Sequence, residues 1–341
     1  MVDVRRLEIL REVARRGSFA KAAAALTLTP SAVSQQIAAL ERSLGLPVVE
    51  RSPRGVRLTE PGRIMVDAAE AVTGELRDAQ ARIDHLVRGA TGSLSVAAFT
   101  TGGQLLLPDA LARLLSAHPG IDLTVQEADA VEGIALVRDG KADLAIAYHY
   151  GEGEPDGASV TWSALTRDPL SVVLPAGHPL ADRPDLDFTD LAGQSWVLGC
   201  HSTAVVLERH AALAGHLPNI VCRSSDFVFA QSLVAAGVGI SLVPRLALAP
   251  SARDPLRGGE LVAVALRSPA PVRHIGAVTA RRRWPQPLVA EVLRALREFA
   301  AGLDEAGRAG ESRRADENGC ADENGRANEN GRAYAAVGLR N

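Results

Sequence analysis

The first 58 residues constrain the fold most, because they contain three short helix patterns in quick succession. Apolar side chains recur at helical spacing over residues 7–14, and Gly17 ends this segment. Ser18 is a suitable N-cap for a second, alanine-rich helix. Thr29 followed by Pro30 places an N-cap before a proline in the first turn, which predicts the start of a third helix.

The third helix has one apolar and one polar face. The apolar stripe consists of Val33, Ile37, Leu40 and Leu44, and the opposite face presents Ser31, Ser34, Gln35 and Ala38. After Gly45, two short apolar segments flank the turn Ser52-Pro53-Arg54-Gly55. This pattern predicts a two-stranded hairpin with arginines near its tip.

Charge is distributed unevenly along the chain. The protein as a whole has a net charge of −3, yet residues 1–63 carry eleven basic against six acidic side chains. A basic front and an acidic rear are typical of a protein in which one module meets nucleic acid. The three cysteines form no CxxC pair, which argues against a disulfide framework or a zinc site.

A long helix is expected after Pro61-Gly62, reaching about Arg88. Its apolar positions are spaced alternately by four and three residues: Met65, Ala69, Val72, Leu76, Ala79, Ile83 and Leu86. Three heptads of this kind predict a coiled-coil contact with a second copy of the chain. The alanines at two seam positions also fit the alternative, packing inside one subunit.

From Ser93 the pattern changes to strands that alternate with helices. The expected strands are Leu94–Phe99, Asp122–Glu127, Leu144–Tyr148, Leu170–Leu174, Trp196–Leu198, Val221–Arg223, Gly239–Val243, Leu261–Leu266 and Ile275–Thr279. The expected helices include Leu105–Ser116, Val131–Asp139, Ala204–Ala214, Phe227–Ala235 and Pro287–Ala300. This alternation implies α/β lobes with open parallel sheets. Residues 303–341 contain a hexapeptide repeat without an apolar face, so we expect them to be disordered.

Several stretches resemble the LysR-type transcriptional regulators. They are Ser18-Phe-Ala-Lys-Ala-Ala, Pro30-Ser-Ala-Val-Ser-Gln-Gln-Ile-Ala-Ala-Leu-Glu41, Leu44-Gly, Arg51-Ser-Pro-Arg54, Leu58-Thr-Glu-Pro-Gly62, Pro175-Ala-Gly-His-Pro-Leu180, Asp190-Leu-Ala-Gly193 and Leu233-Val-Ala-Ala-Gly-Val-Gly-Ile240. The similarity covers about residues 4–300. The chain departs from the family pattern at Pro30-Ser31, where Gln-Pro is usual, and at Val48-Val49, where Leu-Phe is usual.

The resemblance implies an α/β protein in which an all-α winged helix-turn-helix and a linker helix precede a two-lobed effector-binding domain like the periplasmic binding proteins. The expected boundaries are a DNA-binding domain over 1–60, a linker and dimerisation helix over 61–90, an effector-binding domain over 91–302 and a tail over 303–341. Within the effector-binding domain we expect lobe I at about 91–163 and 267–302, and lobe II at about 164–266.

The expected DNA-binding residues lie on the third helix and in the hairpin: Pro30, Ser31, Ser34, Gln35, Arg51, Arg54 and Arg57. Glutamine can bridge N6 and N7 of adenine in the major groove, and short hydroxyls can reach base edges or phosphates. The arginines suit phosphates or a neighbouring minor groove. An ordinary solvated helix face and a polar turn are the alternatives.

Three predicted strand ends lead into helix starts rich in hydroxyl groups. The expected effector-binding residues are Thr100, Thr101, Cys200, His201, Ser202, Thr203, Ser225 and Phe227. Open α/β sheets bind ligands where strand ends face helix N-termini, and the exposed amides there favour anions. By resemblance, these loops line a cleft between the lobes. Each hydroxyl could instead only cap its helix.

Cys200 allows a redox alternative. Peroxide-sensing members of the family carry a reactive cysteine in this loop, followed by histidine and paired with a second cysteine nine residues later. This chain has His201 but carries Arg209 at the later position. A helix N-terminus and His201 could still lower the pKa of the thiol.

No catalytic, metal-binding or cofactor motif is present, so we expect a non-enzymatic regulator that needs no cofactor. Its expected partners are double-stranded DNA with an imperfect palindrome, a small anionic effector, a second copy of the chain in a homodimer or homotetramer and, by resemblance, RNA polymerase. The missing signal core predicts a cytoplasmic protein without membrane contact. The rival functions are a solute-binding protein and an enzyme on the same two-lobed scaffold.

Overall fold

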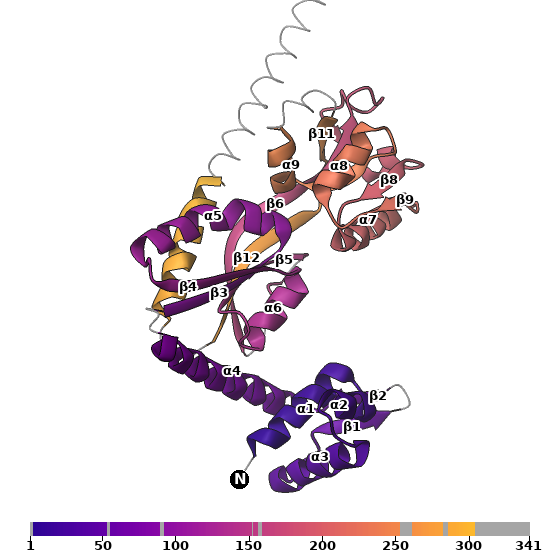
Figure 1. Cartoon of the computed structure of the whole chain (residues 1–341). Helices are drawn as coiled ribbons and strands as arrows, with labels where there is room; N and C mark the ends of the chain where they lie inside the picture. The colour runs from indigo at the N-terminus through magenta and orange to yellow at the C-terminus, as the bar shows by residue number, and fades with distance from the viewer. Residues whose placement is uncertain are drawn as a thin grey trace, which may run out of the picture.

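The computed structural model describes residues 3–52, 55–88, 92–151, 153–155, 159–252, 261–281 and 286–303. It consists of an N-terminal module, one long helix and a two-lobed α/β part (Figure 1). None of the described helices has the length and apolar character that a membrane crossing requires. The predicted hexapeptide-repeat tail lies, from residue 304 onward, outside the described residues.

The N-terminal module contains α1 (Val4–Arg16), α2 (Phe19–Ala25), α3 (Pro30–Leu44), β1 (Val49–Ser52) and β2 (Gly55–Leu58). The predicted caps are present: Ser18 accepts a hydrogen bond from the Lys21 amide, and Thr29 accepts one from the Ala32 amide. A core formed by Leu10, Val13, Val33, Ile37 and Leu40 joins the three helices.

The hairpin is fixed against the end of α1. The Val56 amide donates to the Gly17 carbonyl at 2.9 Å. Gly55 has a φ of +121°, and a Cβ at this position would lie 2.8 Å from the same carbonyl oxygen. Only glycine combines this backbone conformation with such a close approach. Val48, in place of the family's usual leucine, is fully buried in the module's core.

The linker helix α4 (Glu60–Arg88) uses its apolar seam in two different ways. Met65 and Ala69 pack into the core of the N-terminal module. Further along, the side chains of Leu76 and Ile83 are 59% and 54% exposed. The first half of the seam therefore packs inside one chain, and the side chains of Leu76 and Ile83 in the second half remain exposed.

The α/β part contains one continuous mixed sheet in the order β4 (Ile121–Glu127), β3 (Gly92–Ala98), β5 (Leu144–Tyr150), β12 (Val272–Ala280), β6 (Val160–Pro175), β11 (Leu261–Leu266) and β7 (Asp185–Leu186). β10 (Ser241–Pro244) also pairs with β6. The prediction of open parallel sheets was wrong, because β12 runs antiparallel to both β5 and β6. Parallel pairing occurs in the alternating βαβ segment β3–β5, between β8 (Ser195–Leu198) and β9 (Asn219–Arg223), and between β11 and β7.

The long strand β6 connects the two lobes. Its first part pairs with β12, and its second part pairs with β10 and β11. The sequence predicted only Leu170–Leu174, because Arg167-Asp168-Pro169 interrupts the apolar pattern that would have revealed the first part.

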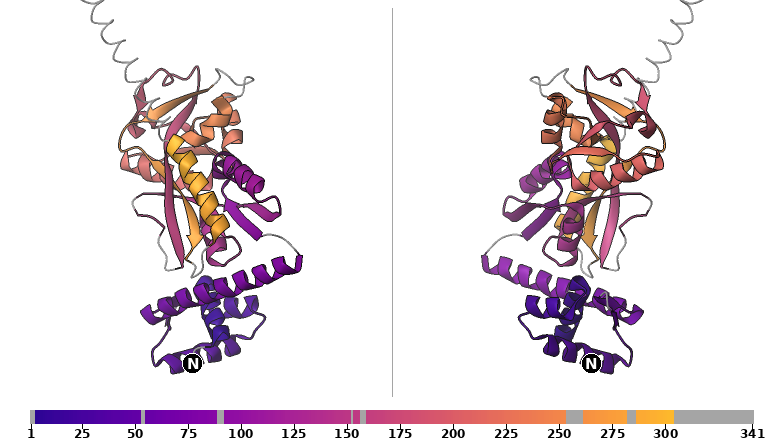
Figure 2. Two further views of the ribbon diagram at one scale, coloured as in Figure 1. Left: turned by 90° about the vertical axis from the view of Figure 1, so that its left-hand side faces the viewer. Right: turned by 90° about the vertical axis from the view of Figure 1, so that its right-hand side faces the viewer.

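Each lobe has its own core and its own helices. Lobe I is covered by α5 (Thr100–Ala117), α6 (Ala130–Arg138) and a helix over 287–303 around Leu94, Leu144 and Ile146. Lobe II contains η1 (Phe188–Leu191), β8 (Ser195–Leu198), α7 (His201–Leu213), β9 (Asn219–Arg223), α8 (Phe227–Ala235) and α9 (Arg245–Ala252) around Leu170, Trp196 and Leu207. In the side views, α4 lies as a bar between the N-terminal helices and the two-lobed part (Figure 2).

Candidate functional site

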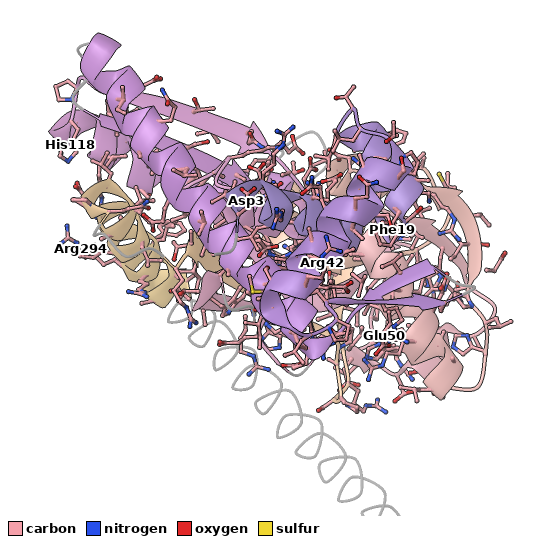
Figure 3. All side chains as sticks on the ribbon, turned by 90° about the horizontal axis from the view of Figure 1, so that it is seen from below. Asp3, Phe19, Arg42, Glu50, His118 and Arg294 are labelled. Carbon is pink, nitrogen blue, oxygen red and sulfur yellow. The ribbon has the colours of Figure 1, made fainter. Side chains whose placement is uncertain are left out.

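The third helix presents the predicted polar face to solvent. Pro30, Ser31 and Gln35 are exposed and Ser34 is half-buried, while Val33, on the opposite face, is fully buried. Figure 3 shows this module from below, with Phe19, Arg42 and Glu50 labelled well away from His118 and Arg294 of lobe I. The structure thus leaves the predicted base-reading side chains accessible.

The hairpin presents at least one of the predicted arginines. Arg57 is exposed on β2, opposite Glu50 of β1. The backbone of Arg51 belongs to β1, paired with Val56. Arg54 lies outside the described residues. The hairpin has the position of a wing beside α3, as the sequence predicted.

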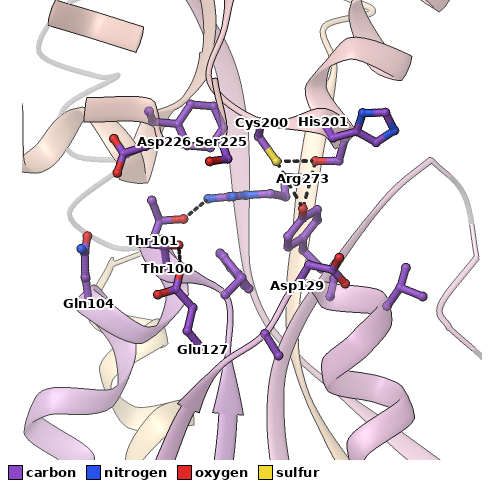
Figure 4. A pocket seen from close by; sticks show the side chains of 18 of the residues that line it. Thr100, Thr101, Gln104, Glu127, Asp129, Cys200, His201, Ser225, Asp226 and Arg273 are labelled. Atoms are coloured by element: carbon purple, nitrogen blue, oxygen red, sulfur yellow. Dashed lines mark hydrogen bonds between the residues drawn. The ribbon is translucent and has the colours of Figure 1, made fainter. Parts of the chain in front are cut away.

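A cavity of about 530 Å³ lies between the lobes. Most of the predicted effector residues line it: Thr100, Thr101, Cys200, His201, Ser202, Ser225 and Phe227. Figure 4 shows Thr100 and Thr101 on one side of Arg273, and Cys200, His201 and Ser225 on the other. Thr203 is the exception, since its side chain is fully buried and its hydroxyl donates to the Cys200 carbonyl at 2.8 Å. The Thr203 hydroxyl is therefore bonded within the first turn of α7 and does not face the cavity.

Arg273 forms the centre of the cavity wall, and sequence reasoning missed it. Its side chain is only 2% exposed, and two of its nitrogens donate to Asp168 Oδ2 at 2.6 and 3.0 Å. A third bond, of 3.1 Å, runs to Thr101 Oγ1. The guanidinium also lies 4.8 Å from the ring centroid of Phe99 and 5.1 Å from that of Tyr148. A buried cation thus acquires both an ion-pair partner and two ring faces.

Asp168 extends this contact into lobe II. Its other oxygen accepts a hydrogen bond of 2.9 Å from the Leu246 amide of α9. Burial raises the pKa of the Asp168 carboxyl, and the Arg273 guanidinium and the Leu246 amide oppose that rise. The Arg273–Asp168 pair lies where the neighbouring strands β6 and β12 pass from one lobe to the other. Thr101 of lobe I bonds Arg273, and the Leu246 amide of α9 in lobe II bonds Asp168.

The helix starts around the cavity fall into two kinds. At α6 and α8, Asp129 and Asp226 accept hydrogen bonds from backbone amides at 2.8 and 2.7 Å, so these termini are capped. At α5 and α7 the N-cap residues are Phe99 and Cys200, and neither supplies a side-chain cap. The free amides therefore belong to the two helices that carry the predicted hydroxyl groups.

Cys200 belongs to a small cluster at the start of α7. Its Sγ lies 3.2 Å from Ser202 Oγ and 3.9 Å from Tyr148 Oη, and the two hydroxyls lie 2.9 Å apart. Burial raises the pKa of Tyr148 to about 12, so the phenol keeps its proton at physiological pH. Cys222 lies on β9 and, like Cys200, is a free cysteine.

Lobe I contacts both the linker helix and α1. At the C-terminal end of α6, Arg138 lies 3.4 Å from Glu70 of α4, and Asp139 lies 3.4 Å from Arg15 of α1. Ser159 also donates to Glu70 at 2.8 Å. Burial raises the pKa of Glu70, which its bond to Ser159 and its pairing with Arg138 counteract.

The residues of the cavity wall that the sequence analysis missed differ in how far the sequence alone could have revealed them. Asp129 and Asp226 each precede a predicted helix and could have been recognised as caps lining the cleft. Arg273 gave no such signal, because its role depends on Asp168, 105 residues away.

Two family models match the chain. The bacterial regulatory helix-turn-helix protein of the lysR family matches residues 4–63, and the LysR substrate binding domain matches residues 88–301. The probable regulator LrrA of Synechococcus elongatus is 30% identical over 311 residues, covering 90% of this chain and all of LrrA. The dual regulator OxyR of Escherichia coli is 28% identical over 301 residues, covering 86% of this chain and 95% of OxyR.

Solved structures agree with this assignment. An OxyR C206 mutant of Corynebacterium glutamicum is 25% identical and superposes with a TM-score of 0.51, over 91% of this chain and 96% of that one. The matched relatives are transcription regulators and not enzymes or solute-binding proteins. The front module, the two-lobed domain and the match over nearly the whole described chain lead to one conclusion: this protein belongs to the LysR family of DNA-binding transcriptional regulators.

Proposed function

We propose that a small effector bound between the lobes controls the geometry with which paired winged helices hold an imperfect palindrome. The main support for this proposal is that α6 reaches from the cavity to the contacts with α4 and α1. Its N-terminal residues Ala130 and Val131 line the cavity, and its C-terminal end contacts Glu70 and Arg15. A lobe movement in response to a ligand would therefore move the linker helix and α1.

The proposed assembly is a homodimer or homotetramer in the cytoplasm that contacts RNA polymerase. A palindrome requires two recognition helices related by a two-fold axis. The exposed seam residues Leu76 and Ile83 supply an apolar contact for a second copy.

The proposed effector is a small anion. The uncapped amides of α5 and α7, together with the hydroxyl of Ser202, can bind a carboxylate. The carboxylates in the cavity wall already have partners in the protein, since Thr100 bonds Glu127 and Asp129 and Asp226 cap their helices. They compete less with an anion than free carboxylates would.

Ser225 offers the cleanest test of the cavity. Its side chain is exposed and lines the cavity, so Ser225→Ala should leave folding unchanged. A hydroxyl bond to a charged ligand contributes about 1.5–3 kcal/mol, so the effector concentration for half response should rise about ten- to a hundredfold. A reporter fused to a promoter that carries the operator, titrated with small carboxylates, gives the measurement. Ser116→Ala, at the far end of α5, is the matched control, and identical curves for both variants would remove Ser225 from the site.

Thr101 is a less specific probe than its sequence position suggested. Thr101→Val would leave Arg273 without one of its hydrogen-bond acceptors, and so would disturb the buried Arg273–Asp168 pair as well as the ligand site.

The proposed route through α6 predicts an uncoupled variant. Asp139→Arg would face Arg15 with a like charge, so induction should fall about fivefold or more while effector affinity stays within about twofold of wild type. The second change Arg15→Asp restores opposite charges and should restore induction. Calorimetry measures binding and the reporter measures response. Full induction by the single variant would exclude this contact from the route.

The recognition helix gives a further prediction. Gln35→Ala should weaken operator binding by about 1–3 kcal/mol, because a bidentate base contact is lost, and should leave binding to random DNA nearly unchanged. Gln36→Ala is the matched control, since Gln36 is exposed but bonded to Arg6. Gel-shift titrations on both DNAs measure the two constants, and equal weakening on both would show that Gln35 reads no base.

A thiol-based redox response through Cys200 is the second candidate. The position of this thiol at the uncapped start of α7, inside the cavity, favours it. Peroxide should then induce the reporter in wild type and not in Cys200→Ser. Induction by a metabolite in both proteins, with no peroxide response, would favour the small-molecule effector.

A further inference from the structure

A second cavity, of about 1210 Å³, opens between the lobes beside the first. Its lobe I wall comes from β5, β6 and β12, and its lobe II wall comes from α7. His149, Tyr150 and Ser202 line both cavities. The two spaces are thus neighbours separated by the end of β5 and the start of α7.

Three basic side chains form a row across the lobe I wall. His274 of β12 stands opposite His149 of β5 and also opposite Arg167 of β6. Residues in such cross-strand pairs share one face of the sheet, with Cβ atoms about 5 Å apart. The imidazoles of His149 and His274 are stacked, with centroids 5.0 Å apart and an interplanar angle of 16°. We call His149, His274 and Arg167 the basic row.

The opposite wall adds further basic groups. Arg209 and His210 of α7 line the cavity from lobe II, and Glu154 is the carboxylate in its described lining. The pKa of His274 is lowered mainly by burial and, to a smaller extent, by the neighbouring His149 and Arg167. The basic row therefore resists further positive charge, and a bound anion would relieve that repulsion.

Part of the wall is aromatic or apolar. The ring of Trp162 lies 5.3 Å from that of His149 at 70°. Val205 and Leu213 of α7 expose 62% and 78% of their surface although both are large and apolar. The cavity thus combines cations with a hydrophobic surface.

We propose that this second cavity binds an organic anion in which a doubly charged head group is attached to an aromatic ring. The head group lies between Arg167 and Arg209, which can each donate two hydrogen bonds to a phosphate or similar group. The ring packs against Trp162 and Leu213. This site does not depend on the proposed effector site in the first cavity, although the shared wall would couple the two energetically.

Phenyl phosphate is a suitable probe, with inorganic phosphate and phenol as its two halves. Calorimetry and tryptophan fluorescence on the full-length protein should show phenyl phosphate binding at least about tenfold more tightly than either half. The double variant Arg167→Gln/Arg209→Gln should weaken that binding by about tenfold or more, because charge-assisted bonds are lost. Arg113→Gln, an exposed arginine of α5, is the matched control and should bind as wild type.

Four outcomes would overturn the proposal. The first is no binding of phenyl phosphate by wild type at about 10 mM. The second is equal binding of inorganic phosphate, and the third is unchanged affinity in the double variant. The fourth is loss of phenyl phosphate binding in Ser225→Ala, which would place the probe in the first cavity, since Ser225 lines only that one of the two described cavities. Unchanged melting temperatures verify that the variants fold.

Discussion

Replacing Arg273 with methionine should lower the free energy of unfolding by about 3–5 kcal/mol, because it leaves the buried Asp168 carboxylate without its cation. Met replaces the aliphatic stem of the arginine and keeps much of its packing, so the loss reports mainly the missing guanidinium with its ion pair and hydrogen bonds. Urea unfolding followed through tryptophan fluorescence, to which the fully buried Trp196 of lobe II contributes, gives the measurement.

Two controls distinguish a buried pair from an ordinary one. Arg113→Met breaks the pair with Glu298, whose side chains are 69% and 59% exposed, and should cost less than about 1 kcal/mol. The double variant Arg273→Met/Asp168→Leu removes both charges and should recover part of the stability. If Arg273→Met and Arg113→Met lower the free energy of unfolding by the same amount, the Arg273–Asp168 pair does not stabilise the contact between β6 and β12.

The second large effect is expected at the linker helix. Leu76→Asp combined with Ile83→Asp should raise the dimer dissociation constant by about a thousandfold or more, since about 4 kcal/mol is lost when unpaired charges enter an apolar contact. Both side chains are more than half exposed in the single chain, so the monomer itself should stay folded.

Sedimentation velocity on the full-length protein measures this change. The matched control is Ala71→Asp, an exposed position of α4 outside the seam. If the double variant sediments like wild type, the exposed half of the seam does not join subunits. A halved mass with unchanged helical content would support the proposed contact.

The N-terminal module was the most predictable part of the molecule because its signals are local. Ser18, Thr29 and Pro30 start their helices where the sequence indicated, and Gly17 and Gly45 end theirs in the left-handed conformation. In the same way the ranges predicted for α8 and β11 agree with the structure. Caps and apolar periodicity act over a few residues, so a single sequence displays them.

The parts that escaped prediction depend on contacts between distant segments. The strand direction of β12 follows from the path of the chain between the lobes, which no local pattern records. Asp168 and Arg273 each interrupt an apolar strand and are understandable only as a pair. The basic row depends on the register of three strands, and a shift of one residue would turn His274 to the other face.

The cleft was predictable in outline. Strand ends followed by hydroxyl-rich helix starts identified most of its lining, because topology alone brings such loops together. The sequence could not show that Thr203 turns inward or that two of the four helix starts are already capped. These details depend on side-chain geometry.

The division of the α4 seam has a consequence for the spacing of the operator. Ala69 packs the first half of the helix against the winged helix-turn-helix, and Leu76 and Ile83 are exposed on the second half, where we propose that a second copy binds. In that assembly, the angle around the helix axis between the two contacts would set how two winged helices face one DNA. One residue inserted between Thr73 and Leu76 would change that angle by about 100° and misalign the recognition helices. Seven inserted residues would nearly restore it while lengthening the helix by about 10 Å, so such a variant should prefer half-sites that are set differently along the DNA.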